Sequence, residues 1–286
     1  MYLLYFIPKN WVSFITGWVV RLKCPSFLQT YINWAFVRVF SINMSEALHT
    51  DPSDYASIED LFTRAIIKKS RIIKGPYASS ADGQLVISKP VEKGEQALQA
   101  KGLTYNIQDL IYGRGQQIKE GFHPSWYTTV YLAPHNYHRV HAPFTGKLLS
   151  IRYVPGELWP VNTKAVNLIP NLFVRNERLI FDFELAEGAK AWVVMVGALN
   201  VGRMTTRFKP DFVTNSLTRQ LDGGRARPAE MSFRGEKAMV NIGDELGIFM
   251  LGSTTVVVLD AKARELLKPT ASTGPRSILM GESLSV

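Results

Sequence analysis

Residues 251–259 read Leu-Gly-Ser-Thr-Thr-Val-Val-Val-Leu and lie close to the C-terminal end of a chain of 286 residues. The second half of this stretch, Thr255–Leu259, is apolar and mostly β-branched, which predicts a buried β-strand. The first half places Gly252, which has no Cβ and tolerates unusual backbone conformations, directly before Ser253. The stretch therefore predicts a core strand that begins at a Gly-Ser step.

The Gly-Ser step has two interpretations. In the first, the hydroxyl of Ser253 attacks the carbonyl of Gly252 and converts the amide to an ester; elimination then breaks the chain and leaves a keto group on the new N-terminus. In the second, Gly-Ser-Thr before a strand is only a turn. The step alone does not decide between them, because an ordinary serine needs a base to become a nucleophile.

Candidate bases lie in residues 134–143, Pro-His-Asn-Tyr-His-Arg-Val-His-Ala-Pro, which contain three of the five histidines of the chain. Upstream, Asp82 stands directly before a glycine in the sequence Ser-Ala-Asp-Gly at 80–83. An aspartate, a histidine and a serine are the components of a base-activated nucleophile. We interpret His141 as the base for Ser253, and Asp82 as the acceptor that orients the His141 ring through its other N–H.

Other interpretations of these residues remain open. The spacing of His135, His138 and His141 is compatible with a zinc site, although the flanking prolines argue against one long helix that presents all three. His135 alone is typical of a solvated loop, and we assign it no role. Arg139 is able to bind a phosphate or to form a structural ion pair. The same ambiguity applies to Arg175, Glu177 and Arg178.

Together, the motifs resemble a known family. Ala81-Asp82-Gly83, Tyr137-His138-Arg139-Val140-His141 and Leu251-Gly252-Ser253-Thr254 are similar, in this order, to the three signature blocks of phosphatidylserine decarboxylase proenzymes. The resemblance extends from about residue 8 to about residue 283. Connecting stretches that also match are Gln99–Gly102, Tyr153–Gly156 and Pro170–Arg178.

The resemblance implies a proenzyme that cleaves itself between Gly252 and Ser253. Its two chains, 1–252 and 253–286, would stay together as a heterodimer, and a further homo-oligomer remains open. Ser253 would become a covalent pyruvoyl group, the only cofactor implied. A substrate amine would form a Schiff base with its ketone, which accepts the electron pair released as CO₂ leaves. The implied reaction converts phosphatidylserine to phosphatidylethanolamine and CO₂.

The carbon that loses CO₂ must regain a proton. His138 is the candidate acid, because histidine titrates near neutral pH, and the resemblance also implies a role for it in decarboxylation. The expected catalytic residues are therefore Asp82, His138, His141 and Ser253, with no metal ion. Two alternatives remain: a pyruvoyl decarboxylase of a soluble amino acid, and a membrane-binding module that keeps the fold but does not cleave.

The N-terminal 45 residues and the net charge of +9 predict an anionic partner. This segment contains no acidic residue and eleven aromatic ones, and its longest uncharged run, 24–37, is too short to span a bilayer. Its basic, tryptophan-rich pattern favours a helix in the interface of an anionic membrane; the alternative is a helix pair packed in the core. No nucleic-acid motif is present. The apolar stripe comprises Trp11, Phe14, Ile15, Trp18, Val19 and Leu22.

These patterns predict two parts: a membrane-associating helical segment over 1–45 and a catalytic domain over 46–286. We expect an α+β fold whose body is mostly antiparallel β-structure, with curved sheets that are barrel-like or sandwich-like. Residues 44–70 are predicted to be helical, with a helix start at Ser57. The single Cys24 fits a reducing compartment, and we expect a peripheral protein on the cytoplasmic face of the cell (inner) membrane. The clearest strand predictions are Trp126–Leu132, Lys147–Val154, Leu179–Phe183 and Ala191–Val196.

Overall fold

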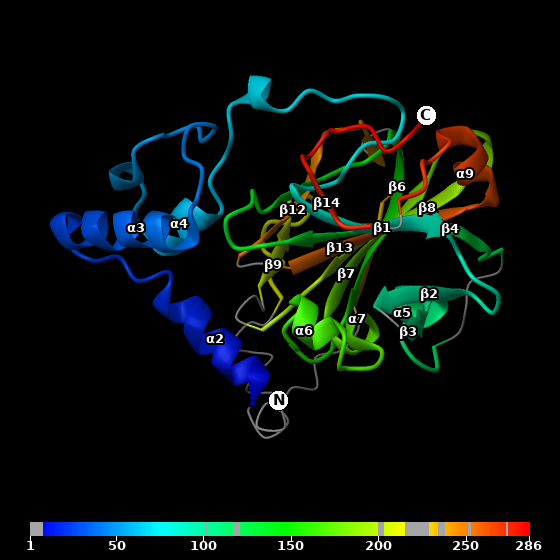
Figure 1. The fold of residues 1–286 in the computed structure, drawn as a ribbon, viewed down its shortest axis with the longest axis horizontal. Helices are drawn as coiled ribbons and strands as arrows, with labels where there is room; N and C mark the ends of the chain where they lie inside the picture. Colours follow the sequence, from blue (N-terminus) through cyan, green and yellow to red (C-terminus); the bar gives the residue numbers. More distant parts are fainter. Residues whose placement is uncertain are drawn as a thin grey trace.

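A β-rich body makes up most of the protein, and two helices stand to one side of it (Figure 1). The computed structural model describes residues 8–100, 102–116, 121–199, 203–214, 229–233, 238–250, 253–272 and 274–286. The body is built on a nine-stranded sheet in the order β10-β6-β7-β8-β13-β4-β1-β14, with β11 pairing on β6, and its pairs are antiparallel. The strands are β1 (Gly83–Pro90), β4 (Pro124–Leu132), β6 (Gly146–Val154), β7 (Arg178–Glu184), β8 (Lys190–Val196), β10 (Ala229–Ser232), β11 (Met239–Val240), β13 (Ser253–Asp260) and β14 (Arg276–Ile278).

Strand β13 lies inside the sheet, between β8 and β4, and all eight of its residues are buried. A strand covered on both faces is expected to be almost continuously apolar, as Val256–Leu259 are. Each of these side chains contributes about 1.5–3 kcal/mol through burial of its apolar surface. The predicted buried strand is confirmed. It begins at Ser253, and Gly252 lies outside the described residues.

Smaller elements surround this sheet. A three-stranded sheet has the order β5-β12-β9, and β2 and β3 form a two-stranded one. The α+β class, the antiparallel β-rich body, the N-terminal helices and the four clearest strand predictions are confirmed. The remaining bounds are β2 (Gln96–Ala100), β3 (Leu103–Asn106), β5 (Arg139–His141), β9 (Met204–Thr206), β12 (Glu245–Phe249), α5 (Ile107–Tyr112), α6 (Thr163–Val166), α7 (Leu172–Arg175) and α9 (Ala261–Leu267).

The helix expected over residues 44–70 is wrong for most of its length. The segment contains α4 (Ile58–Phe62) and two single 3₁₀ turns, at Pro52–Asp54 and Lys68–Ser70. The predicted helix start is confirmed, because the Ser57 hydroxyl accepts the N–H of Asp60 at 3.1 Å. The stretches before and after α4 are hydrogen-bonded to each other through their backbones. The N–H of Leu48 donates to Ala65 and the N–H of Ile67 donates to Glu46.

The N-terminal helices α2 (Lys9–Val19) and α3 (Ser26–Phe40) bury polar or small residues and expose apolar ones. In α3, the Asn33 side chain donates to the carbonyls of Pro52 and Tyr55, at 2.9 and 2.8 Å, which fixes the polar face of the helix inward. The alternative in which the aromatic stripe packs in the core is wrong, because Trp11 and Trp18 are 41% and 55% exposed. No helix in the described ranges is both long enough and apolar enough to cross a membrane. Other exposed apolar residues here are Ile15, Val19, Leu22, Phe27, Leu28, Tyr31, Trp34, Val39 and Phe40.

Candidate active site

The register of three neighbouring strands brings the sequence motifs to one end of the large sheet. Strand β1 begins directly after Asp82, β4 ends just before the histidine segment, and β13 begins at Ser253. Gln84 of β1 and Thr254 of β13 lie on either side of Tyr131 of β4. Because these strands are antiparallel neighbours, the starts of β1 and β13 meet the end of β4. The three motifs, separated by more than 100 residues at the extremes, therefore share one site.

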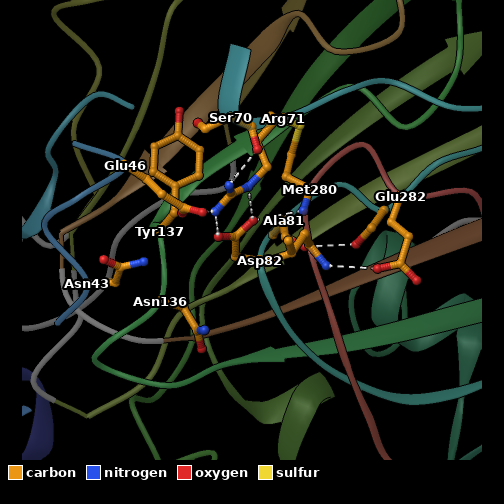
Figure 2. A network of polar contacts seen from close by, with 12 residues as sticks. Asn43, Glu46, Ser70, Arg71, Ala81, Asp82, Asn136, Tyr137, Met280 and Glu282 are labelled. Carbon is orange, nitrogen blue, oxygen red and sulfur yellow. Dashed lines mark hydrogen bonds and ion pairs between the residues drawn. The ribbon is translucent and has the colours of Figure 1, made fainter. Parts of the chain in front are cut away.

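Asp82 is buried and held by an ionic network (Figure 2). Its Oδ1 accepts from Arg71 Nε at 2.9 Å and from the backbone N–H of Met280 at 2.8 Å, and its second oxygen pairs with Arg71 Nη2. Arg71 also pairs with Glu46 at 2.8 Å. Burial alone would lower the pKa of Arg71, but the hydrogen bonds and charges of Asp82 and Glu46 raise it above its ordinary value. Asp82 is thus fixed by a buried cation and by the C-terminal segment.

The glycine after Asp82 has a packing reason. A Cβ at Gly83 would overlap the backbone carbonyl oxygen of Tyr131 on the neighbouring strand. The Asp-Gly pair therefore marks a close approach of β1 and β4, which a larger residue would prevent.

The His141 ring has partners that differ from the expected ones. Its Nδ1 lies 2.7 Å from the carbonyl oxygen of Gly243 and its Nε2 lies 3.0 Å from the Tyr137 hydroxyl. A carbonyl only accepts, so Nδ1 carries the proton, and Nε2 of the neutral ring accepts from Tyr137. Burial lowers the pKa of His141, against the opposing effects of the Gly243 carbonyl and nearby acids, which keeps the ring neutral. The Gly243 carbonyl therefore fixes the tautomer of His141, a role expected of Asp82. Asp82 acts on the ring only through its charge.

His138 is fully buried, with its ring packed against Phe62 at a centroid distance of 4.0 Å. Its Nδ1 lies 2.8 Å from the carbonyl oxygen of Asn136, so Nδ1 carries the proton. Its Nε2 has no hydrogen-bond partner within the described part of the chain. Burial lowers the pKa of His138 to about 3. The expectation that this ring titrates near neutral pH is therefore wrong for this environment, and the ring is neutral.

Ser253 is fully buried, and its Oγ has no hydrogen-bond partner among the residues that the structure describes. Alternate residues of a strand share a face, so Ser253 and Thr255 point the same way. The Thr255 hydroxyl lies 3.1 Å from that of Ser80, whose carbonyl accepts the N–H of His141 at 2.8 Å. The face of β13 that carries Ser253 is thus the face next to the His141 segment. An unsatisfied buried hydroxyl costs about 1–3 kcal/mol, which is typical of a functional group.

The backbone before the Gly-Ser step is tied to the other histidine. The N–H of Phe249, four residues before Ser253, donates to the carbonyl of His138 at 3.0 Å. The N–H of Met250 donates to Arg203 at 3.1 Å. The histidine segment therefore holds the chain that leads into Ser253.

The charged residues whose roles the sequence did not decide form hydrogen bonds and ion pairs within the protein. Arg139 donates to the carbonyl of Thr63 and pairs with Glu245, both at 3.0 Å. Within the described ranges, no group of three or more histidine, cysteine or acidic side chains is placed to hold a metal ion. Arg175 pairs with Glu157, Arg178 donates to the carbonyls of Asp109, Leu110, Val174 and Asn176, and Glu177 accepts from Tyr153 and Thr214.

Sequence reasoning missed the groups that hold the named residues. Tyr137 stands within the histidine motif, four residues before His141, and this position could have suggested that its phenol contacts the His141 ring. Arg71 falls in the segment that was expected to be helical, and no motif marks it. Gly243 contributes a backbone carbonyl, which leaves no trace in a sequence.

A pH titration of stability tests the burial of His138. The pKa is about 3 in the fold and about 6.5 in the unfolded chain, so between these values the unfolded chain binds more protons. The free energy of unfolding should be fully retained above pH 6.5 and should fall below it, by about 1 kcal/mol between pH 7 and pH 5.5 from this group alone. Chemical denaturation of Ser253→Ala, which is expected to keep the chain in one piece, measures this fall, and adding His138→Gln should reduce it. An equal fall in both proteins would contradict the assignment.

Comparison with known proteins identifies the family. The family described as "Phosphatidylserine decarboxylase" matches residues 58–285. A phosphatidylserine decarboxylase proenzyme of Alcanivorax borkumensis is 38% identical over 275 residues, which cover 93% of this chain and 89% of that protein. Proteins of the same description from Alkalilimnicola ehrlichii and Methylobacillus flagellatus are 36% and 34% identical, over 91% and 98% of this chain and 88% and 96% of theirs. The chain belongs to the phosphatidylserine decarboxylase family, a family of carboxy-lyases.

Proposed function

We propose that this protein is a self-processing, pyruvoyl-dependent decarboxylase that converts phosphatidylserine to phosphatidylethanolamine and CO₂. The observation that carries the proposal is the buried Oγ of Ser253, which has no partner among the described residues and lies on the face of β13 next to the His141 segment, in a chain of this family. The test is CO₂ release from phosphatidylserine by the purified protein, with Ser253→Ala as the inactive control. CO₂ from a soluble amino acid instead would favour the first alternative, and no CO₂ from either would favour the membrane-binding module.

In the proposed self-processing, His141 accepts the proton of the Ser253 hydroxyl at Nε2, by displacing Tyr137 or through its hydroxyl. The Ser253 oxygen attacks the carbonyl carbon of Gly252, and the amide nitrogen takes up the proton as the ester forms. A base then removes the α proton of residue 253, and elimination breaks the bond between Cβ and the ester oxygen, which leaves a carboxylate on Gly252 and a dehydroalanine whose tautomer is an imine. Water then releases ammonia from the new N-terminus, where a ketone remains. The pieces are residues 1–252 and 253–286.

The position of Ser253 fits a pyruvoyl group. The residue is fully buried at the start of a strand, and its side chain donates to no described group, so a ketone there loses no hydrogen bond. When formed, the group supplies an electrophile for the substrate amine and a sink for the electron pair left by CO₂.

His138 is the proposed proton carrier of the decarboxylation. Because its ring is neutral, it must accept a proton before it can donate one. Its Nε2, which has no partner in the described part of the chain, suits this order of events: it takes the proton that the substrate ammonium must lose, and returns it to the α carbon after CO₂ has left. Phe62 packs against the ring, and both side chains are buried, which favours proton exchange with the substrate over exchange with water.

An apolar cavity of about 340 Å³ provides a route for the lipid. It is lined by Phe62, which packs on His138, and by Leu132, the ladder partner of Ser253. Apolar surroundings disfavour a carboxylate, which assists its loss as CO₂. The cavity also reaches the N-terminal helices, through Thr16, Val20, Phe36 and Phe40.

We further propose that residues 1–45 form a membrane-associating segment and residues 46–286 the catalytic domain. The exposed apolar side chains of α2 and α3 would enter the acyl boundary of an anionic membrane, with Lys23 at its headgroups. Lys9 and Arg21, which were expected there too, instead lie over the Trp159 ring and pair with Glu59, respectively. The protein would then be peripheral, on the cytoplasmic face of the cell (inner) membrane.

Vesicle co-sedimentation tests this attachment. Trp11→Glu combined with Trp18→Glu should release the protein from anionic vesicles, because both side chains are exposed apolar surface. Each basic residue near the surface adds about 1 kcal/mol, and salt screens this part but not the apolar part. Wild-type binding should therefore weaken at high salt without vanishing. Leu266→Glu, on α9 across the body from α2 and α3, is the control that should still bind (Figure 1). Full binding by the double variant would place the membrane contact elsewhere.

A further inference from the structure

Arg64 is a buried cation that forms no ion pair with any described residue, although the charges of Asp82 and Glu46 act on it through space. The residue is 5% exposed, and within the described part of the chain neither its Nε nor its Nη1 has a hydrogen-bond partner. Its one hydrogen bond to a described residue runs from Nη2 to the carbonyl of His135 at 3.2 Å. A guanidinium stays charged under all ordinary conditions and offers five donors, so this burial is costly unless a ligand completes it.

A polar cavity of about 170 Å³ lies against Arg64. Its lining also includes Arg71 and the carboxylates of Asp82 and Glu46, and these two carboxylates take up the charge of Arg71 in the network of Figure 2. Arg64 is therefore the lining cation with donors to spare. Asn43 also lines the cavity. Its side-chain oxygen accepts from Ser45, so its amide N–H₂ group is the part that can donate to a ligand. The cavity is large enough for several waters, or for one tetrahedral oxyanion in their place.

The cavity adjoins the candidate active site. Arg64 follows Phe62 by two residues, and Phe62 packs on the His138 ring. Arg64 also bonds the carbonyl of His135, three residues before His138, and its charge acts on His138. Arg139, in the same motif, is satisfied by a carbonyl and a carboxylate, so it does not offer the same free donors.

We infer that Arg64 and its cavity bind the phosphodiester of the substrate headgroup, an inference that rests on the proposed function. The substrate carries two anionic groups, and the carboxylate is the less suitable partner. An ion pair with the carboxylate would stabilise the ground state more than the transition state, in which its charge moves away, and would slow the reaction. The phosphodiester keeps its charge throughout, so binding it anchors the headgroup at no such cost.

Binding to the uncleaved full-length chain tests the cavity without turnover. Calorimetric titration of Ser253→Ala with glycerophosphoserine, the water-soluble headgroup, should give saturable binding. Adding Arg64→Met should weaken it about 10- to 100-fold, the effect of a lost hydrogen bond to a charged group. Adding Lys69→Met instead, which removes an exposed charge five residues along the chain and outside the cavity lining, should leave the affinity unchanged.

A second variant guards against misfolding. Methionine is of similar length and uncharged, so Arg64→Met should not lower the melting temperature, whereas loss of a structural ion pair would. If Arg64→Met does fail to fold, Arg64→Lys carries the comparison: it keeps the charge but loses the planar fork, and should weaken headgroup binding to a smaller extent.

Kinetics of the processed enzyme separate this inference from the proposed function. With phosphatidylserine in micelles, Arg64→Met should raise KM about 10- to 100-fold with a smaller change in kcat. If the wild type releases CO₂ and Arg64→Met changes neither KM nor headgroup binding, the inference alone fails. If inorganic phosphate binds as tightly as glycerophosphoserine, with the same dependence on Arg64, the cavity takes free phosphate and the headgroup assignment is wrong. Absence of CO₂ release by the wild type would remove the proposed function, while the titration would still report on the cavity.

Discussion

Purified protein is expected to separate under denaturing conditions into two pieces, the smaller of about 3.8 kDa, since 34 of the 286 residues of the 32.2 kDa chain follow Gly252. The smaller piece should lack a free amino terminus, because a keto group replaces it. Ser253→Ala should remain full length, because it has no hydroxyl to attack the preceding carbonyl. Intact-mass spectrometry and N-terminal sequencing measure both outcomes.

Thr254→Ala is the matched control for this prediction. The Thr254 hydroxyl is also buried and without a partner in the described part of the chain, but it points to the opposite face of β13 from Ser253. Cleavage should therefore survive its removal. A wild-type protein that stays in one piece, with an unmodified Ser253, would sink the self-processing proposal and leave the membrane-binding module.

The two pieces should nevertheless purify together under native conditions. Strand β13 of the small piece is hydrogen-bonded to β4 on one side and β8 on the other. Further along, the N–H of Met280 donates to Asp82 and the N–H of Leu284 donates to Tyr77, each at 2.8 Å. A single gel-filtration peak that contains both pieces is the expected result. The contact between Met280 and Asp82 also joins the small piece directly to the site.

Periodicity and composition correctly predicted the helices and strands whose residue pattern matches the burial of their side chains in the fold. The β-branched run after Ser253 became a buried central strand, and Ser57 capped the helix that it was expected to start. The helix predicted over residues 44–70 is wrong because the two ends of this segment are hydrogen-bonded to each other, from Leu48 to Ala65. Such pairing depends on the body against which the segment packs, and a helical pattern in a short window does not contain it.

The sequence named the residues that the sheet register brings together, but it did not give their contacts, and their catalytic roles stay a prediction. Asp82, His138, His141 and Ser253 are the groups that the sheet register brings to one end. The acceptor that orients His141 is a backbone carbonyl about 100 residues away, at Gly243, and a carbonyl has no sequence signature. The neutral state of His138 follows from its burial against Phe62, which only the packed structure reveals.

Substitutions of His141 and His138 are expected to block different stages, self-cleavage and decarboxylation respectively. His141→Ala should slow self-cleavage by a factor of about 10² to 10⁴, because Ser253 loses its general base. His138→Ala should still cleave, because the ring acts only after the ketone exists, but its CO₂ release should fall by about 10² to 10⁴. Cleavage followed by intact mass, and CO₂ release measured on the same preparations, separate the two stages. His123→Ala, at an exposed position, is the control for loss of a histidine.

Asp82 occupies a different place in this scheme, since it bonds Arg71 and Met280 rather than the His141 ring. Asp82→Ala would leave Arg71 buried without its main partner, a change that costs several kcal/mol, so cleavage should be blocked or greatly slowed through loss of the local structure. Asp82→Asn keeps the shape and the acceptor for Met280 but removes the charge, and should cleave faster than Asp82→Ala. If Asp82→Ala has wild-type stability and still does not cleave, Asp82 acts directly on the chemistry. If cleavage is abolished in His138→Ala and normal in His141→Ala, the roles of the two histidines are reversed.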